Sequence, residues 1–247
     1  MLPSRSNPSW RIKLSVIIPA HNEENFLPGC LSSIDAAQKN WGGEVEIVVV
    51  LNRCSDRTEE IARAVGAVIA KEEAKNLSRI RNAGIAASSG KMIMTIDADS
   101  RFHPMTFCDV AKKLESGRYV GGGAMVYPER YSMGIITTGF VAALYLAKFN
   151  VSFGTFWTTR AACEAMGGFN PEFVTIEDVD FAVRLKKLGK HRDQKFGTLW
   201  RSALTTSCRK FDQFGDWHLV RDSGFVARAF TGKDQVAGDE YWYEPGR

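Results

Sequence analysis

The stretch "EVEIVVVLNRCSDRTEEIARAVG", residues 44–66, decides the fold of this chain. Its first part, residues 44–51, is an apolar, β-branched run of the length expected for one buried strand. Polar turn residues follow, and then a helical pattern in which Asp56 is placed as a cap, Glu59 completes a capping box, and Gly66 ends the helix. A buried strand that passes directly into a helix is the repeating unit of α/β proteins.

The same alternation of strand and helix extends to both sides of this stretch. Before it, "KLSVIIPA" (residues 13–20) predicts a strand, and residues 24–38 predict a helix. After it, residues 76–90 predict a helix, "KMIMTI" (residues 91–96) predicts a strand, and Pro104 indicates the start of another helix. Near-continuous apolar strands are typical of a parallel sheet covered on both faces, so we expect a doubly wound, Rossmann-like α/β fold.

The second half of the chain has a less regular pattern. We expect a strand at residues 119–128, a helix at 133–148, a strand at 151–158, helices near Arg160 and Asp178, and a final helix within 212–230. The apolar region 133–149 is interrupted by Lys148 and is shorter than the ~20 residues that span a bilayer. We therefore expect a soluble protein that can lie against a membrane.

Composition and charge narrow the function classes. The chain has 247 residues and 45% hydrophobic content, which is enough for a substantial core in one domain. Its net charge is +4, and basic and acidic residues are interleaved, which argues against nucleic acid as a partner. The five cysteines are scattered without a CxxC pair, so we expect reduced thiols and a cytoplasmic location. The inner face of the membrane is included in that expectation.

Two aspartates follow the predicted strand at residues 91–96 without any spacer of turn residues. In an open α/β sheet, the ligand crevice lies beyond the carboxyl ends of the strands, where Asp97 and Asp99 are expected. Such carboxylates are hard oxygen ligands for Mg²⁺ or Mn²⁺, which take further oxygens from a substrate's phosphates. The alternative is that Asp99 only caps the next helix and Asp97 only forms a turn.

Further polar residues are expected at the same edge of the sheet. "PAHNEEN" follows the first strand and "LNRCSDRT" follows the second, so three strand ends carry polar residues toward one crevice. Arg79 and Arg81 lie in the helix before the aspartates, where such residues can pair with phosphate oxygens. The alternative for both arginines is an ordinary solvated helix face.

Five segments carry a combined pattern: "VIIPAHNEE", "VVVLNRCSDRT", "SRIRNAGIAASSGKMIMTIDADS", "GGFNPEF" and "IEDVDFAVRLKKLG". Together they resemble the family-two glycosyltransferases of the GT-A fold. The resemblance covers residues 12–210 in the family's order and implies a mainly parallel sheet with a small antiparallel part on the acceptor side. It implies a single domain over residues 1–247. The nucleotide-sugar half would be about 12–118, the acceptor half about 119–211, and a C-terminal helix and tail about 212–247.

The resemblance implies that the donor nucleotide lies at the ends of the first two strands. Matching positions of the family surround the base and ribose with Pro19, Ala20 and Glu23. The family usually places a base-binding aspartate where this chain has Leu51, followed by Asn52. Leucine cannot accept a hydrogen bond, so Asn52, the backbone or other groups must bind the base. UDP-sugars are the favoured donors, and GDP-sugars are the alternative.

The resemblance also implies a metal ion, Mn²⁺ or Mg²⁺, at Asp97-Ala98-Asp99. Asp99 would bind the metal directly, Asp97 would contact ribose or metal-bound water, and Ala98 lies between them against the donor. Arg81 would approach the diphosphate, and Arg209 would close over it.

Catalysis is expected in the second half of the chain. In inverting members of the family, an aspartate of the ED motif takes the proton from the acceptor hydroxyl, which predicts Asp178 as the base and Glu177 as an orienting residue. His218 is a candidate third metal ligand. The alternative is that Glu177, Asp178 and Asp180 only supply negative charge to the first turn of a helix.

Several alternatives stay open at this point. A retaining reaction is possible if Asp178 contacts the donor, and a non-catalytic sugar-nucleotide binder could keep the same fold. A dinucleotide oxidoreductase is disfavoured because "GGG" at residues 121–123 has the wrong pattern and place for GxGxxG. The acceptor, a saccharide or a lipid-linked group, and the oligomeric state are left undetermined.

Overall fold

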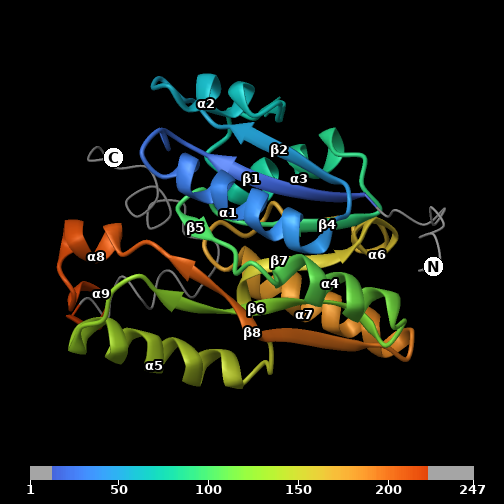
Figure 1. The fold of residues 1–247 in the computed structure, drawn as a ribbon. Helices are drawn as coiled ribbons and strands as arrows, with labels where there is room; N and C mark the ends of the chain where they lie inside the picture. The colour runs from blue at the N-terminus through green and yellow to red at the C-terminus, as the bar shows by residue number, and fades with distance from the viewer. Residues whose placement is uncertain (1–12, 222–247) are drawn as a thin grey trace, which may run out of the picture.

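The computed structural model describes residues 13–221 and contains one eight-stranded sheet (Figure 1). The strands are β1 (Leu14–Ala20), β2 (Val45–Leu51), β3 (Val68–Lys71), β4 (Met92–Thr95), β5 (Ser100–Arg101), β6 (Tyr119–Pro128), β7 (Phe153–Thr159) and β8 (Lys195–Thr206). Their spatial order is β3-β2-β1-β4-β7-β6-β8-β5. Only β5 and β7 run against the other strands of the described sheet, which confirms a mainly parallel sheet with a small antiparallel part.

Helices cover both faces of the sheet, as the sequence predicted (Figure 1). They are α1 (Leu27–Trp41), α2 (Thr58–Ala64), α3 (Leu77–Ala87), α4 (Thr106–Glu115), α5 (Met133–Ala147), α6 (Arg160–Ala165), α7 (Glu177–His191), α8 (Arg209–Phe214) and α9 (His218–Arg221). Along β1, Val16 and Ile18 enter the core shared with α1 and α4, whereas Ile17 enters the core shared with α3 and α7. This alternation gives the sheet two separate hydrophobic cores.

The helix signals were partly right. Asn76 caps α3 by accepting from the amide of Arg79, and Gly66 has a φ of +72° just after α2, as expected of a C-terminal glycine. The capping box was wrong: the carboxylate of Asp56 accepts from the amide of Thr58 at 3.0 Å, but Glu59 pairs with side chains further along the chain. Glu59 therefore stabilises the exposed face of α2.

Three strands were missed by the sequence analysis: β3, β8 and the two-residue strand β5. β3 has only four residues, VIAK, which is shorter than the apolar runs of the predicted strands, and its side chains are exposed or only half-buried. β8 has two exposed residues and then three buried residues in succession, a pattern that breaks the alternation expected of a strand. Helix α1 begins at Leu27 and not at residue 24, with Pro28 in its first turn as predicted.

The glycine triplet lies in the middle of β6 and has a packing role. A Cβ atom on Gly122 would lie 1.8 Å from the carbonyl oxygen of Gly197 and 2.6 Å from the ring of Trp157. Trp157 is fully buried, and its indole N–H donates to the carbonyl oxygen of Gly123 at 2.9 Å. The triplet therefore makes room for the largest side chain of the core.

The C-terminal prediction is only partly covered by the structure. Two short helices, α8 and α9, occupy residues 209–214 and 218–221, and the rest of the predicted final helix lies outside the described residues. Within residues 13–221, no helix combines the length and the apolar character that crossing a membrane requires.

Candidate functional site

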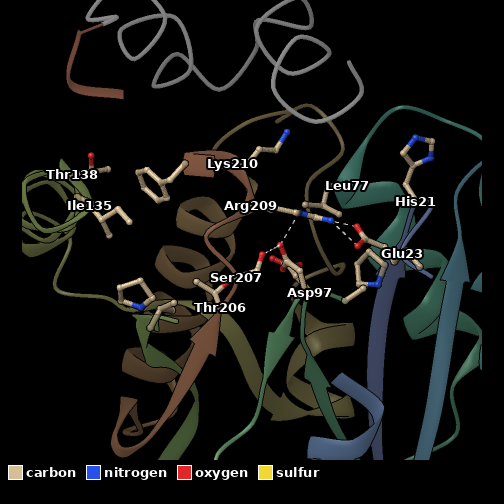
Figure 2. A pocket seen from close by; sticks show the side chains of 18 of the residues that line it. His21, Glu23, Leu77, Asp97, Ile135, Thr138, Thr206, Ser207, Arg209 and Lys210 are labelled. Carbon is tan, nitrogen blue, oxygen red and sulfur yellow. Dashed lines mark hydrogen bonds and ion pairs between the residues drawn. The ribbon is translucent and has the colours of Figure 1, made fainter. Parts of the chain in front are cut away.

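The carboxyl ends of β1, β2, β4, β6 and β8 meet at one cavity of about 460 Å³ (Figure 2). Its lining includes the following residues that the sequence analysis selected: Pro19, Ala20, Glu23, Asn52, Asp97, Ala98, Asp99 and Arg209. Because parallel strands end at the same edge of the sheet, distant segments of the chain are brought together there. We call this space the donor cavity, because the resemblance placed the expected nucleotide-sugar donor at these strand ends.

Arg81 lies at the centre of a buried charge network that joins the two acidic motifs. Its guanidinium is 2.5 Å from Asp178, 3.1 Å from Glu177 and 3.2 Å from Asp97. Only 4% of the Arg81 side chain is exposed, and the guanidinium also lies 5.2 Å from the ring centroid of Phe169. The structure thus places Arg81 against carboxylates, whereas the resemblance had implied a contact with the diphosphate.

The first turn of α7 separates two roles among its acidic residues. Asp180 forms an ion pair with Arg184 one turn later at 2.7 Å, which is an ordinary helix contact. Glu177 and Asp178 instead both turn toward Arg81. Burial raises the pKa of Glu177 well above the usual carboxyl range, and the charge of Asp178 adds to this while Arg81 opposes it. The alternative that these acids only supply negative charge to the first turn of the helix therefore suits Asp180, but it does not explain the contacts of Glu177 and Asp178 with Arg81.

Asp99 and Glu23 are joined across the donor cavity by Arg209. The guanidinium of Arg209 donates to both carboxylate oxygens of Glu23, at 2.7 and 2.9 Å, and its Nε lies 3.0 Å from Oδ2 of Asp99 (Figure 2). The hydroxyl of Ser207 donates to the same oxygen of Asp99 at 3.0 Å. The segment between β8 and α8 is therefore fixed to the ends of β1 and β4 by charge.

Asn52 presents an acceptor to the donor cavity. Its side chain is almost fully buried, and its amide nitrogen donates to the carbonyl oxygens of Glu72 and Ala74, at 2.5 and 2.9 Å. These two bonds fix the amide orientation, and Oδ1 is left buried without a hydrogen-bond partner among the described residues. Leu51, in contrast, packs into the core with α1. A ligand N–H group would satisfy the Asn52 oxygen.

Helix α5 forms an apolar wall of the donor cavity. Ile135, Thr138, Gly139 and Ala142 line the cavity from one side of this helix. Its N-terminus is capped by Ser132, whose hydroxyl accepts from the amide of Ile135 at 3.2 Å. The cavity thus has carboxylates and cations at one end and an aliphatic surface at the other.

His218 is not among the residues that line the donor cavity. Its ring packs against Phe211 and Phe214, with centroids 5.4 and 5.6 Å away, and its Nδ1 is 2.8 Å from the carbonyl oxygen of Gly215. Within residues 13–221, no three His, Cys, Asp or Glu side chains are grouped as a metal site. The structure therefore brings together Asp97 and Asp99, without His218.

Comparisons with known proteins agree with this architecture. The sequence model of the family described as "Glycosyl transferase family 2" matches residues 15–170, more than half of the chain. The chain belongs to this family. The match spans β1 to β7 and so includes Asp97 and Asp99.

Curated relatives resemble part of the chain. A dolichol-phosphate mannosyltransferase of Pyrococcus furiosus is 33% identical over 147 residues, which are 53% of this chain and 41% of that protein. An undecaprenyl-phosphate 4-deoxy-4-formamido-L-arabinose transferase of Pseudomonas paraeruginosa is 32% identical over 116 residues, 44% of this chain and 34% of that protein. The chain thus matches less than half the length of these relatives.

Solved structures share the fold at low sequence identity. S. aureus TarS in complex with UDP-GlcNAc has a TM-score of 0.61 and 17% identity, covering 79% of this chain and 58% of that chain. Glucosyl-3-phosphoglycerate synthase of Mycobacterium tuberculosis, in complex with Mn²⁺, UDP and phosphoglyceric acid, has a TM-score of 0.58 and 19% identity, covering 91% of this chain and 80% of that chain. These likenesses show the GT-A fold.

Some lining residues had not been selected from the sequence. Ser207 was missed because a lone serine after a strand carries no signal of its own. The wall of α5 was missed because the helix is apolar on all sides, so its sequence does not tell which face meets a cavity. Leu77 and Ile80 of α3 also line the cavity, although the sequence predicted only a helix at their positions.

Proposed function

We propose that this protein transfers a sugar from a nucleotide-diphospho-sugar to an acceptor hydroxyl. The observation that carries the proposal is the network around Arg81, which holds Asp97 of the DxD motif and Asp178 of the ED motif on one buried cation at the edge of the donor cavity. A binding protein needs only the first motif. A transferase needs both, because donor activation and proton removal must occur on the same sugar.

The donor nucleotide fits the end of the cavity at β1 and β2. The unpartnered oxygen of Asn52 is suited to accept from an N–H group of the base, and uracil and guanine both carry such a group on their pairing edge. Pro19, Ala20 and Glu23 line the adjacent surface. UDP-sugars are favoured because solved structures of the same fold were obtained with UDP or UDP-GlcNAc. The diphosphate would lie toward Arg209 and Lys210.

Asp97 and Asp99 fit a divalent cation such as Mn²⁺ or Mg²⁺. Both line the cavity, and their carboxylates are the hard oxygen donors that these ions prefer, with the remaining positions left for diphosphate oxygens and water. Asp99 would hold the ion, and Arg209 would move from Asp99 toward the diphosphate. When bound, the ion offsets the negative charge that develops on the leaving nucleotide. The proposal assigns no third protein ligand to the ion, and His218 stays a candidate.

Asp178 is proposed as the general base. Part of its side chain, 24%, is exposed, so one oxygen can accept the acceptor's proton while the other stays at 2.5 Å from Arg81. Glu177 is buried and orients the same guanidinium. The acceptor oxygen then attacks the anomeric carbon as the nucleotide leaves, and the reaction inverts the configuration. A retaining reaction is the alternative if Asp178 contacts the donor sugar.

A lipid-linked acceptor is favoured over a free saccharide. The outward side of α5 exposes the apolar side chains of Met133, Ile136, Phe140 and Leu144, and the inward side lines the donor cavity. An acyl or isoprenoid chain could therefore follow α5 to the reacting end. The curated relatives are named for dolichol phosphate and undecaprenyl phosphate. The protein would then work at the cytoplasmic face of a membrane.

Nucleotide release is the measurement that tests this proposal. The full chain is incubated with UDP- and GDP-sugars and Mn²⁺, with and without polyprenyl-linked saccharides or soluble sugars, both of which carry free hydroxyl groups. We expect release to require metal and to rise with one acceptor class. Asp99→Ala should abolish metal-dependent donor binding, whereas Asp35→Ala, an exposed aspartate paired with Lys39, should not. Tight donor binding without release or transfer from any donor would instead indicate a non-catalytic binder.

A further inference from the structure

A second concavity, of about 380 Å³, lies between the last turn of α4, the start of β6 and the middle of β8. Among the described residues, it shares no lining side chain with the donor cavity. Four cations and one carboxylate line it: Lys112, Lys113, Arg118, Arg201 and Asp109. We call it the basic concavity.

The cations of the basic concavity are not neutralised by neighbouring acids. Within residues 13–221, none of the four forms an ion pair, and the ammonium of Lys113 lies 4.4 Å from the ring centroid of Tyr119. The one carboxylate, Asp109, accepts from the hydroxyl of Ser202 at 2.8 Å. The two lysines suit the helix dipole at the end of α4, but this does not explain Arg118 and Arg201, which lie outside the helix. The surplus of positive charge favours an anionic ligand.

The strand β8 is distorted at this place so that an aromatic ring is exposed. Pairing between β6 and β8 shifts from Ala124–Leu199 to Val126–Leu204, so residues 200–203 of β8 stand opposite a single residue of β6. Trp200 and Arg201 are consecutive and both exposed, with 67% of Trp200 accessible to solvent. Bulges of this kind redirect side chains. Protection of a sheet edge would explain an arginine here, but not an exposed indole.

We propose that the basic concavity binds a phosphorylated saccharide. The indole of Trp200 offers a flat apolar surface to one face of a sugar ring, and Arg118 and Arg201 offer paired N–H donors to the phosphate. The same strand, β8, ends at Thr206, which lines the donor cavity. At ~3.3 Å per residue along the strand, Thr206 lies within about 20 Å of Trp200. The site is separate from sugar transfer, and its occupancy does not depend on the function proposed above.

Ligand-observed NMR on the full chain tests this site with glucose 6-phosphate, glucose and inorganic phosphate as probes. We expect saturable binding of glucose 6-phosphate with a dissociation constant on the order of millimolar, and weaker binding of either part alone. The double variant Arg118→Gln with Arg201→Gln should weaken glucose 6-phosphate binding at least tenfold. Trp200→Ala should weaken it several-fold without changing the affinity for inorganic phosphate.

A matched double variant controls for the loss of charge. Lys187→Gln with Lys190→Gln removes two exposed cations from α7 and should leave binding unchanged. Equal affinity of the two double variants for glucose 6-phosphate would overturn the site. An unchanged affinity in Trp200→Ala would overturn the saccharide contact. Binding only to phosphatidylglycerol vesicles, measured by sedimentation, would assign the concavity to a membrane surface and would also overturn the proposal.

Discussion

Nη1 of Arg81 lies 2.5 Å from Oδ1 of Asp178, although the two residues are 97 positions apart in the chain. Nη2 of the same guanidinium holds Asp97 at 3.2 Å. Because only 4% of the Arg81 side chain is exposed, its guanidinium depends on these carboxylates rather than on water for its hydrogen bonds. The orientation of the proposed base therefore depends on a buried cation that also fixes one end of the DxD motif.

Replacing Arg81 by lysine should distinguish the effect of the guanidinium's shape on catalysis from the effect of its positive charge. The lysine ammonium keeps the positive charge but lacks the planar fork that serves Asp97 and Asp178 at once. We expect kcat to fall roughly 10- to 100-fold while donor affinity changes little, which steady-state kinetics and donor titrations measure. Arg184→Lys is the matched control, because Arg184 pairs with Asp180, which lies in the same first turn of α7 as Asp178. Equal losses in both variants would indicate a general packing defect.

Asp178→Asn should remove the base while keeping the shape of the site. An amide can still contact Arg81 weakly, but it cannot take a proton from the acceptor hydroxyl. The transfer rate should fall by roughly 10²-fold or more, with donor binding nearly unchanged. Single-turnover measurements and a donor titration check both quantities. Full activity of this variant would exclude Asp178 as the base.

Asn52→Ala should weaken the binding of UDP by about fivefold to fifteenfold, as expected for the loss of one buried hydrogen bond. Cytosine lacks the N–H group that uracil presents at N3, so wild-type protein should bind UDP more tightly than CDP, and the variant should lose this preference. Calorimetric titrations with both nucleotides measure the effect. Leu51→Met, in the neighbouring core position, should leave the preference intact. A preserved preference in Asn52→Ala would place base recognition elsewhere.

The donor side of the site could be predicted from the sequence because parallel strands end at one edge. Asn52, Asp97 and Asp99 each follow an apolar run, and the sheet brings them to the same cavity. Ion pairs between side chains from distant segments leave no comparable pattern in the sequence. Arg209 and Glu23 are 186 positions apart, and nothing local marks them as partners. The pairing of Arg81 with α7 was missed for the same reason.

The outward face of α5 gives a further prediction. Phe140→Asp combined with Leu144→Asp places two charges on its exposed apolar side without touching the residues that line the donor cavity. We expect weaker sedimentation with lipid vesicles and lower transfer to a polyprenyl-linked saccharide, because apolar contact with the bilayer is lost. Transfer to a water-soluble acceptor should be unaffected. Val183→Asp, at an exposed position on α7, is the control, and an equal effect there would argue against α5 as the lipid contact.

Glu46 should make the stability of the fold depend on pH far from the donor cavity. Burial alone would raise the pKa of its carboxyl, but hydrogen bonds from Ser15 and Ser89 and the ammonium of Lys13, at 2.6 to 2.9 Å, lower the pKa to about 2. The folded pKa lies below the ordinary value of 4.5, so the ionised carboxylate stabilises the folded state above that pH. This contribution is lost as the pH falls from 4.5 toward 2.

Urea unfolding of Glu46→Gln at several pH values measures that contribution. We expect the free energy of unfolding at pH 7 to fall by about 2 kcal/mol, since the amide keeps part of the hydrogen bonding but not the charge. The difference from wild type should shrink steadily below pH 4.5, because protonation makes the wild-type carboxyl neutral as well. Glu164→Gln changes a largely exposed carboxylate and should show little difference at any pH. A pH-independent loss in Glu46→Gln would mean that shape and not charge accounts for the stabilisation.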